Sequence, residues 1–229
     1  MLVTIDKDVL RFLNGHLGGT DSTAYQRCSA FAYRDMCRTI RFAPSYTEGA
    51  VQGNKERKRI ANAKLVLRDR VTDLIQAQVQ AWLLNVPDQD RYDEDHRHLC
   101  EQIILLYRNT TTQTDAGNSL YFGQAQKWVN MTLKNLYVYT ESNDTRLSLR
   151  PLLPYMHIPL DNIIMDIAAD TKRCYIDPPN RKYAVKKPST PWSKLDFAEY
   201  ARYQRELVAK IDHSYPLVWE LTHWSTVEE

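Results

Sequence analysis

Two segments of the chain carry residues whose types and spacing could do chemistry. The first, LYFGQAQKWVNMTLKNLYVY (residues 120–139), has a helical period and places Lys127 and Asn130 on one face. The second, MHIPLDNIIMDIAAD (residues 156–170), has Asp161 directly before a helical run, where a carboxylate caps a helix N-terminus. An amine and a carboxylate that meet where two helices begin can act as a nucleophile and as a stabiliser of developing positive charge.

Each of these side chains also has an ordinary structural role. Lys127 falls in the first two turns of its predicted helix, where the helix dipole favours a neutral, nucleophilic amine. A solvated lysine, or one that contacts a phosphate, is nevertheless the commoner role for such a residue. Asp161 is expected to act as an N-cap worth about 1 kcal/mol, whatever else it does. His157, four residues earlier, is either the wall of a polar pocket or a hydrogen-bonded histidine in the core.

The two segments together resemble a known signature. GQAQKWVN (residues 123–130), followed by IPLDNII (residues 158–164), is similar to the motif of the helix-hairpin-helix DNA glycosylase superfamily. That motif consists of a glycine-bearing hairpin, a lysine that opens a helix with an asparagine three residues on, and a later V/I-P-x-D-x-x-V/I segment. The resemblance covers roughly residues 120–170 and no iron–sulfur motif follows it.

The resemblance implies a DNA glycosylase that extrudes a base from duplex DNA and removes it. It implies Lys127 as the Schiff-base nucleophile of a bifunctional enzyme, Asp161 as the residue that assists base loss, and Asn130 as a structural or pocket residue. Lys127 and Asp161 are then expected to face one solvent-accessible cleft with room for a sugar between them. The expected partner is double-stranded DNA containing a modified base, with no cofactor and no metal. The other candidates for substrate binding flank the pair: Gln126, Trp128, Lys134, Tyr155 and His157. For Trp128 and Tyr155 a place in the core is the commoner role.

The chain departs from the superfamily pattern in two respects. The hairpin usually carries two glycines around an apolar residue, and only Gly123 is present here, which puts the usual backbone cradle for phosphate in doubt. The interval between lysine and aspartate is also longer than in the commonest members. Longer intervals are found in divergent branches, which include archaeal 8-oxoguanine enzymes and antiphage enzymes that excise glucosylated hydroxymethylcytosine. The resemblance therefore implies either a hypermodified phage cytosine or an oxidised purine as the substrate base.

Positive charge gathers in two stretches rather than over the whole chain, whose formal net charge is only +2. Residues 54–70 contain seven lysines and arginines against two acidic residues, and precede an apolar segment of the same predicted helix. Such a helix can place one face in the core and the other on a phosphate backbone. A second basic stretch, residues 181–187, is predicted as a surface loop. The candidates for DNA contact are Lys64, Arg68, Lys186 and Lys187.

Two other functions compete with the glycosylase. Arg91 and His96 have the R-x4-H spacing of HEPN ribonucleases, which are small helical proteins that act on RNA. A non-catalytic helical DNA-binding protein is the third possibility. Substitution separates the three, because Asp161 matters only to a glycosylase, and Arg91 with His96 only to the nuclease.

The elements that must position these residues are predicted to be helices. Seven glycines and few alternations of Val, Ile and Thr argue against a large sheet, so the predicted fold class is all-α and mainly helical. The resemblance to the glycosylases implies a two-lobed helical body. Residues 1–229 are predicted to form a single helical domain, with two lobes (1–53 with 141–229; 54–140) as the alternative. Helices are predicted over residues 4–17, 21–43, 54–85 (as two helices or one bent helix), 87–109, 120–139, 161–170, 193–211 and 214–224. The helix over 21–43 is predicted to bury one stripe: Tyr25, Cys28, Ala32, Met36 and Ile40. Ile163 is expected on the buried side of its helix, and the polar loop 110–119 is expected to tolerate motion.

Composition limits the remaining possibilities. The four cysteines form no C-x-x-C pair, so they are predicted to be reduced thiols and not zinc or iron–sulfur ligands. No signal-peptide core and no apolar run of roughly 20 residues is visible, so the protein is expected in the cytoplasm with no membrane partner. The sequence leaves the oligomeric state and the choice between repair and defence open.

Overall fold

The computed structural model describes residues 23–47, 53–143, 145–170, 184–211 and 215–224. The regular structure within these ranges is helical, with no strand and one isolated β-bridge, so the predicted all-α class is confirmed. The predicted helix over residues 4–17 and the loop around Arg181 and Lys182 lie outside the described residues. The described α-helices are α2 (Ala24–Cys37), α3 (Asn54–Leu84), α4 (Gln89–Leu106), α5 (Phe122–Ser142), α6 (Asn162–Ala169), α7 (Phe197–Val208) and α8 (Pro216–Trp224).

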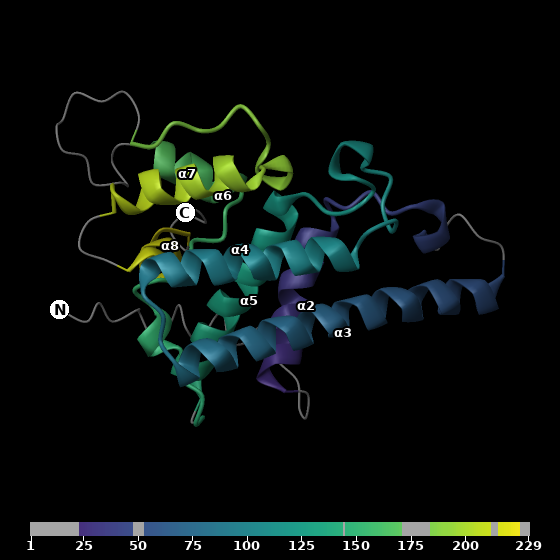
Figure 1. The fold of residues 1–229 in the computed structure, drawn as a ribbon, viewed down its shortest axis with the longest axis horizontal. Coiled ribbons are helices and arrows are strands. Elements are labelled where there is room, and N and C mark those ends of the chain that lie inside the picture. The colour runs from purple at the N-terminus through teal and green to yellow at the C-terminus, as the bar shows by residue number, and fades with distance from the viewer. Residues whose placement is uncertain (1–22, 48–52, 144, 171–183, 212–214, 225–229) are drawn as a thin grey trace.

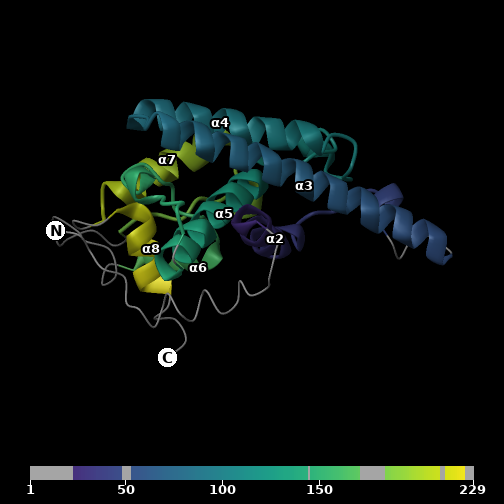
Figure 2. The ribbon, with the colours of Figure 1, turned by 90° about the horizontal axis from the view of Figure 1, so that it is seen from below.

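The helix α5 lies at the centre of the molecule. Figure 2 shows α3 and α4 together on one face of it, with α2 and α8 on its two flanks. Every residue from Phe122 to Val138 is buried, including the lysines and amides. The sequence predicted one apolar stripe beside a basic face, and both are in fact enclosed. All seven described helices contribute residues to one connected hydrophobic core. The division of the chain into one or two lobes stays a prediction.

Gly123 is needed for close packing. It is the second residue of α5, and a Cβ atom there would lie only 2.0 Å from the carbonyl oxygen of Trp192. Its N–H donates to the carbonyl of Leu195 at 2.9 Å, so that donor is already used within the protein. The glycine therefore admits the crossing of residues 192–195 over α5.

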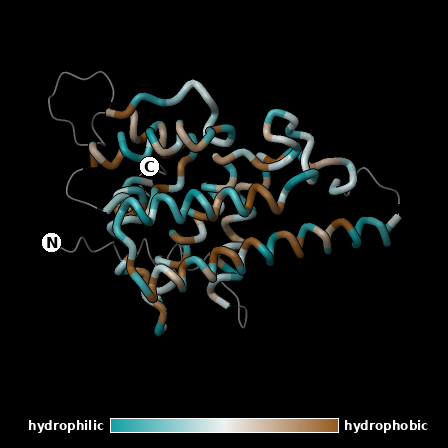
Figure 3. The backbone as a smooth tube through the Cα atoms, in the orientation of Figure 1, coloured by the Kyte–Doolittle hydropathy of each residue, from teal (hydrophilic) through white to brown (hydrophobic). Residues whose placement is uncertain are grey.

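The helix α3 is one continuous helix of 31 residues, where the sequence left open two helices or one bent one. At about 1.5 Å per residue it is roughly 46 Å long. Its second half is fixed in the core by Val71, Ile75, Val79 and Trp82, which are buried at helical spacing. Its first half extends beyond the other helices, as Figure 1 shows, and in Figure 3 it is mostly hydrophilic.

Local capping signals place most helix starts. Asp88 and Asp161 accept the backbone N–H groups that cap α4 and α6; the Asp161 cap was predicted, and α4 begins two residues after its predicted start. The sequence offered Asp21 or Ser22 as the cap of α2 and Ser193 as the cap of α7, and both were wrong, because Thr23 caps α2 and Asp196 caps α7. The α2 helix ends at Cys37, six residues before the predicted end, and its predicted buried stripe is confirmed: Tyr25, Cys28, Ala32, Met36 and Ile40.

Two further predictions need correction. The polar loop 110–119 was expected to tolerate motion, but Gln113 and Ser119 are buried, and the Gln113 side chain donates to the Ser119 carbonyl at 2.7 Å. Ile163 was expected on the buried side of α6 and is 43% exposed, because the inward side of this short helix is filled by Ile164 and Ile167. Among the described helices, none combines the length and apolarity needed to span a membrane.

Candidate functional site

The structure brings Lys127 and Asp161 into direct contact. Lys127 lies in the second turn of α5 and Asp161 is the residue that caps α6, and Lys127 Nζ is 2.6 Å from Asp161 Oδ2. The lysine side chain is 6% exposed and the aspartate side chain 20% exposed, so solvent reaches the pair from the Asp161 side. The sequence argument also expected an open cleft with room for a sugar between them. That expectation is wrong for this state, because the two groups form a closed ion pair.

Asp161 is held as an anion. Burial on its own would raise the pKa of Asp161, but the charge of Lys127 and the N–H of Ile164, which donates to Oδ1 at 2.8 Å, outweigh burial and lower it. The carboxylate is therefore ionised at neutral pH and has no proton to give. It can accept hydrogen bonds or stabilise positive charge that develops beside it.

Two buried amide side chains of α5 hold the segment that carries Asp161 next to Lys127. Asn130 Nδ2 donates to the Ile158 carbonyl at 3.3 Å, and Gln126 Nε2 donates to the Leu160 carbonyl at 3.4 Å. These bonds tie the extended segment that precedes α6 along the side of α5. The sequence predicted Gln126 and Asn130 as substrate-binding residues. Both are fully buried, so their observed role is to position the segment that carries Asp161.

Lys134 and Trp128 were also predicted to bind substrate, and the structure places both in the interior. Lys134 Nζ lies 2.6 Å from Glu220 Oε1, and the two side chains are 4% and 1% exposed. Trp128 is completely buried, and its indole Nε1 donates to the carbonyl of Ser29 at 3.2 Å. Neither side chain presents a surface to a ligand in this state, because each is enclosed by neighbouring helices.

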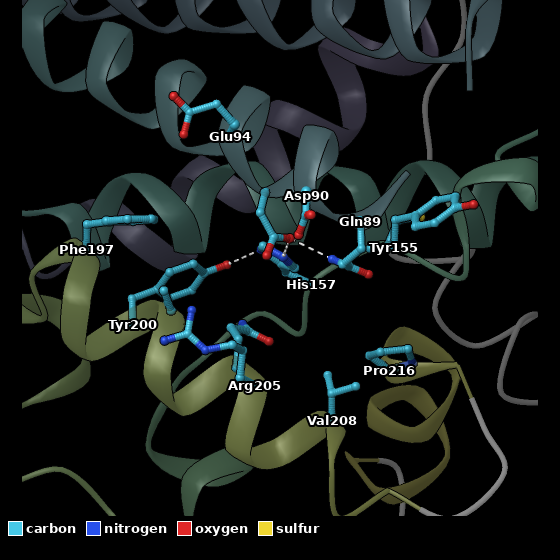
Figure 4. A pocket seen from close by; sticks show the side chains of 14 residues that line it. Gln89, Asp90, Glu94, Tyr155, His157, Phe197, Tyr200, Arg205, Val208 and Pro216 are labelled. Carbon is cyan, nitrogen blue, oxygen red and sulfur yellow. Dashed lines mark hydrogen bonds and ion pairs between the residues drawn. The ribbon is translucent and has the colours of Figure 1, made fainter. Parts of the chain in front are cut away.

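The other two predicted pocket residues, Tyr155 and His157, do line a cavity. It has a volume of about 380 Å³ and lies between α4, α7 and the segment before α6, as Figure 4 shows. Its wall is mixed aromatic, amide and acidic in character. The lining residues are Gln89, Asp90, Asp93, Glu94, Tyr155, Met156, His157, Phe197, Tyr200, Ala201, Gln204, Arg205, Val208 and Pro216. Lys127 and Asp161 are not among them, so this cavity is separate from the ion pair.

A chain of hydrogen bonds runs inward from this cavity. His157 Nε2 is 2.9 Å from Asp93 Oδ1, and His157 Nδ1 is 2.8 Å from the Tyr200 hydroxyl. Asn130 Nδ2 donates to that hydroxyl at 2.9 Å, and Asn130 Oδ1 is 2.8 Å from His96 Nε2. Burial raises the pKa of Tyr200 well above its usual value, so the phenol stays protonated and can donate a hydrogen bond. Burial would raise the pKa of Asp93, but its hydrogen bond with His157 and the other polar groups around it outweigh burial and lower it, so the carboxylate accepts a hydrogen bond from His157 Nε2.

The ribonuclease alternative needs Arg91 and His96 at one accessible surface, and the structure separates them. His96 is completely buried, and burial, followed by the charge of His157, lowers its pKa to about 3. It is neutral at physiological pH and enclosed by the core. The Arg91 side chain is 72% exposed and pairs with Asp95 at 2.9 Å. The R-x4-H spacing thus places one residue inside and the other outside, which does not support this function.

The predicted DNA contacts lie at the surface in two places. On α3, the Lys64 ammonium lies 4.6 Å from the centre of the Phe42 ring, and Arg68 pairs with Asp69 at 3.1 Å. Lys186 and Lys187 follow the undescribed part of their loop; both are exposed, and Lys187 pairs with Asp166 of α6. All four cations remain within reach of a large anionic partner, since none is buried.

The sequence argument missed three residues of these polar clusters: Asp93, Tyr200 and Glu220. Asp93 belongs to the acidic run DEDH, which resembles a solvated helix start, and Tyr200 fits an ordinary apolar stripe. Glu220 had a detectable signal, because it is an acidic residue inside the otherwise apolar and aromatic run PLVWELTHW. A buried charge requires a partner, and Lys134 is the partner that the structure supplies.

Comparison of the chain with protein-family models, with curated proteins and with solved structures finds no match. Within the part of the chain that the structure describes, no group of three or more His, Cys, Asp and Glu side chains is arranged to hold a metal ion. Cys28, Cys37 and Cys100 are free thiols, and Cys174 lies outside the described residues.

Proposed function

We propose that the chain is a DNA glycosylase that flips a modified or damaged base out of duplex DNA and excises it. The observation that carries this proposal is the contact between Lys127 and Asp161. These residues are 34 positions apart in sequence and meet at 2.6 Å, with Asp161 at the N-terminus of a helix. They are the same two residues that the GQAQKWVN and IPLDNII segments single out. A chance resemblance gives no reason for them to meet.

The proposed reaction uses Asp161 as an anion. When the bond between the base and the sugar C1′ breaks, the base leaves with the electron pair, and positive charge develops on the sugar. The ionised carboxylate stabilises that charge, and a water molecule then adds to C1′ and releases a proton to solvent. Lys127 is held as an ammonium in the resting ion pair, and an ammonium has no lone pair with which to attack. We therefore propose hydrolysis by water, with Lys127 serving to orient and balance Asp161.

The test is to incubate the pure protein with duplex DNA that carries normal, oxidised or glucosylated hydroxymethylated bases. The expected result is release of one kind of modified base and formation of abasic sites, with no adduct trapped by borohydride. If borohydride traps an adduct with the natural chain but not with Lys127→Ala, then Lys127 is the nucleophile, and the reaction follows a lyase route instead of hydrolysis by water. Absence of release from every substrate would contradict the glycosylase and leave a helical DNA-binding protein.

The projecting half of α3 is proposed as a DNA-binding surface. Reversing the charge of both Lys64 and Arg68 to glutamate should weaken DNA binding, because two contacts with phosphate are lost. If each contact contributes about 0.9 to the slope of log affinity against log salt, the slope should become shallower by about 2. The measurement is the salt dependence of the dissociation constant for a short duplex.

The matched control reverses Arg202 on α7 and Lys210, two residues after the end of α7, which changes the net charge equally in another part of the molecule. The same reversal at Lys186 and Lys187 tests the second basic stretch separately. Equal affinity and slope for the α3 variant and the α7 control would show that the basic half of α3 is only a solvated surface.

A further inference from the structure

A second buried ion pair lies beside the first. Lys127 and Lys134 are seven residues apart on α5, which places them two turns apart on the same face. Lys127 contacts Asp161 at the start of α6, and Lys134 contacts Glu220 of α8. The helices α6 and α8 also pack against each other. Two cations and two anions from three helices therefore form one cluster, which we name the charge cluster: Lys127, Lys134, Asp161 and Glu220.

The second pair is poorly suited to a role in stability alone. Both of its side chains are almost completely buried, and among the described residues Glu220 Oε2 has no hydrogen-bond partner. Burial raises the pKa of Glu220 even though Lys134 opposes the shift. Buried ion pairs can often be replaced by apolar side chains with little loss of stability, so the presence of this pair calls for another explanation.

The explanation lies in the field that Lys134 exerts on Asp161. In the resting state Asp161 is balanced by the direct contact with Lys127. Both carboxylate oxygens are engaged, Oδ1 by the Ile164 N–H and Oδ2 by Lys127, so a sugar that takes the place beside Oδ2 must separate it from Lys127. A mostly buried carboxylate that loses its nearest cation tends to take up a proton. Lys134 is the next cation along the same face of α5, and its charge already contributes to the lowered pKa of Asp161.

We propose that Glu220 is a positioning residue of this site: it holds Lys134 as a fixed cation that keeps Asp161 anionic when Lys127 separates from it. The inference rests on the proposed function, because base release is the event that opens the first pair. The groups that face Asp161 are Lys127 and Lys134 from α5, the Ile164 N–H from α6 and Glu220 from α8. Glu220 acts through Lys134 and does not itself contact a substrate.

The test mimics the opened pair with Lys127→Met and then measures the pKa of Asp161 from its side-chain carboxyl carbon by NMR. Adding Lys134→Met should raise that pKa by about 0.3 to 1.2 pH units, from Coulomb's law at about 10 Å and an effective dielectric constant of about 20 to 80. Adding Glu220→Met instead should also raise it, because Lys134 left buried without its anion loses its proton or moves to solvent. If Glu220 acted only by its own charge, its removal would lower the pKa of Asp161. The sign of the shift therefore decides the proposal.

Two further variants complete the test. Lys134→Met with Glu220→Met removes the pair as a unit and should give the same pKa of Asp161 as Lys134→Met alone, even if Glu220→Met by itself does not fold. Glu141→Gln breaks the exposed pair of Glu141 with Arg150 at the far end of α5 and should leave the pKa of Asp161 unchanged.

The pH profile of base release separates this inference from the proposed function. In chains that keep Lys127, the acid side of the profile should move to higher pH in the Lys134→Met and Glu220→Met variants. The NMR measurement does not need activity, so a chain that releases no base would refute the glycosylase and still test the positioning role. A catalytically active chain whose acid limb and Asp161 pKa stay unchanged in both variants overturns the inference alone.

Discussion

Replacing Asp161 by asparagine is expected to slow base release at least about 100-fold while the protein stays folded and still binds DNA. Asparagine is a good N-cap, so its side-chain oxygen can still accept the Ile164 N–H that now lies 2.8 Å from Oδ1. What it loses is the negative charge that stabilises the sugar as the base leaves, and the loss of one such group typically costs a factor of 10² to 10³. Single-turnover release of the modified base, measured with excess enzyme, gives the factor directly.

The matched control for this change is Asp196→Asn. Asp196 caps α7 as Asp161 caps α6, and it accepts the Glu199 N–H at 2.8 Å. It is exposed and touches neither member of the Lys127 pair, so its replacement should alter base release less than about threefold. If Asp161→Asn were no slower than this control, Asp161 would be a cap and nothing more, and the proposed mechanism would fail.

Trp128→Ala is expected to lower the free energy of unfolding by about 3 to 5 kcal/mol, the range found for removal of a large aromatic side chain from a core. The indole is completely buried, and its ring centre lies 4.8 Å from that of Tyr33 and 6.0 Å from that of Tyr107. Its loss also leaves the Ser29 carbonyl without the indole donor. Urea unfolding measured by far-UV circular dichroism gives the change.

Trp128→Phe serves as the graded comparison, because it keeps a buried ring and should cost less than the alanine variant. The sequence first predicted Trp128 as a residue that binds the substrate. A Trp128→Ala protein with unchanged stability and selectively impaired base release would support that first interpretation over the core role that the structure gives it.

Sequence alone predicted the features that depend on short-range signals. The helical class, the cap formed by Asp161 and the buried stripe of α2 each follow from residues within a few positions of one another. The meeting of Lys127 with Asp161 was predicted only through the resemblance to glycosylases. No spacing rule joins two residues that lie 34 positions apart with a loop between them.

The burial of the basic face of α5 could not be predicted in this way. From its sequence neighbourhood alone Lys134 resembles a solvated lysine, because its partner Glu220 lies 86 positions later in the chain. The cavity could not be predicted from the sequence for the same reason. Its residues Asp93 and His157 are 64 positions apart and belong to two separate helical regions. Such pairs depend on how whole helices pack, and a window of sequence contains only one member of each pair.

The enclosure of α5 has a consequence for how the protein is made. The ribosome synthesises Lys134 before its partner Glu220, which lies 86 positions later. Trp128 follows Ser29, whose carbonyl accepts the indole hydrogen bond, by 99 positions. The α5 segment therefore emerges with several polar groups and a large apolar surface that only later segments can cover. Until α7 and α8 have been synthesised, the helices that complete the enclosure of α5 are missing from the nascent chain. Cotranslational folding of the described region should accordingly stop at loosely packed helices, and the native core should close only after α8 has left the exit tunnel.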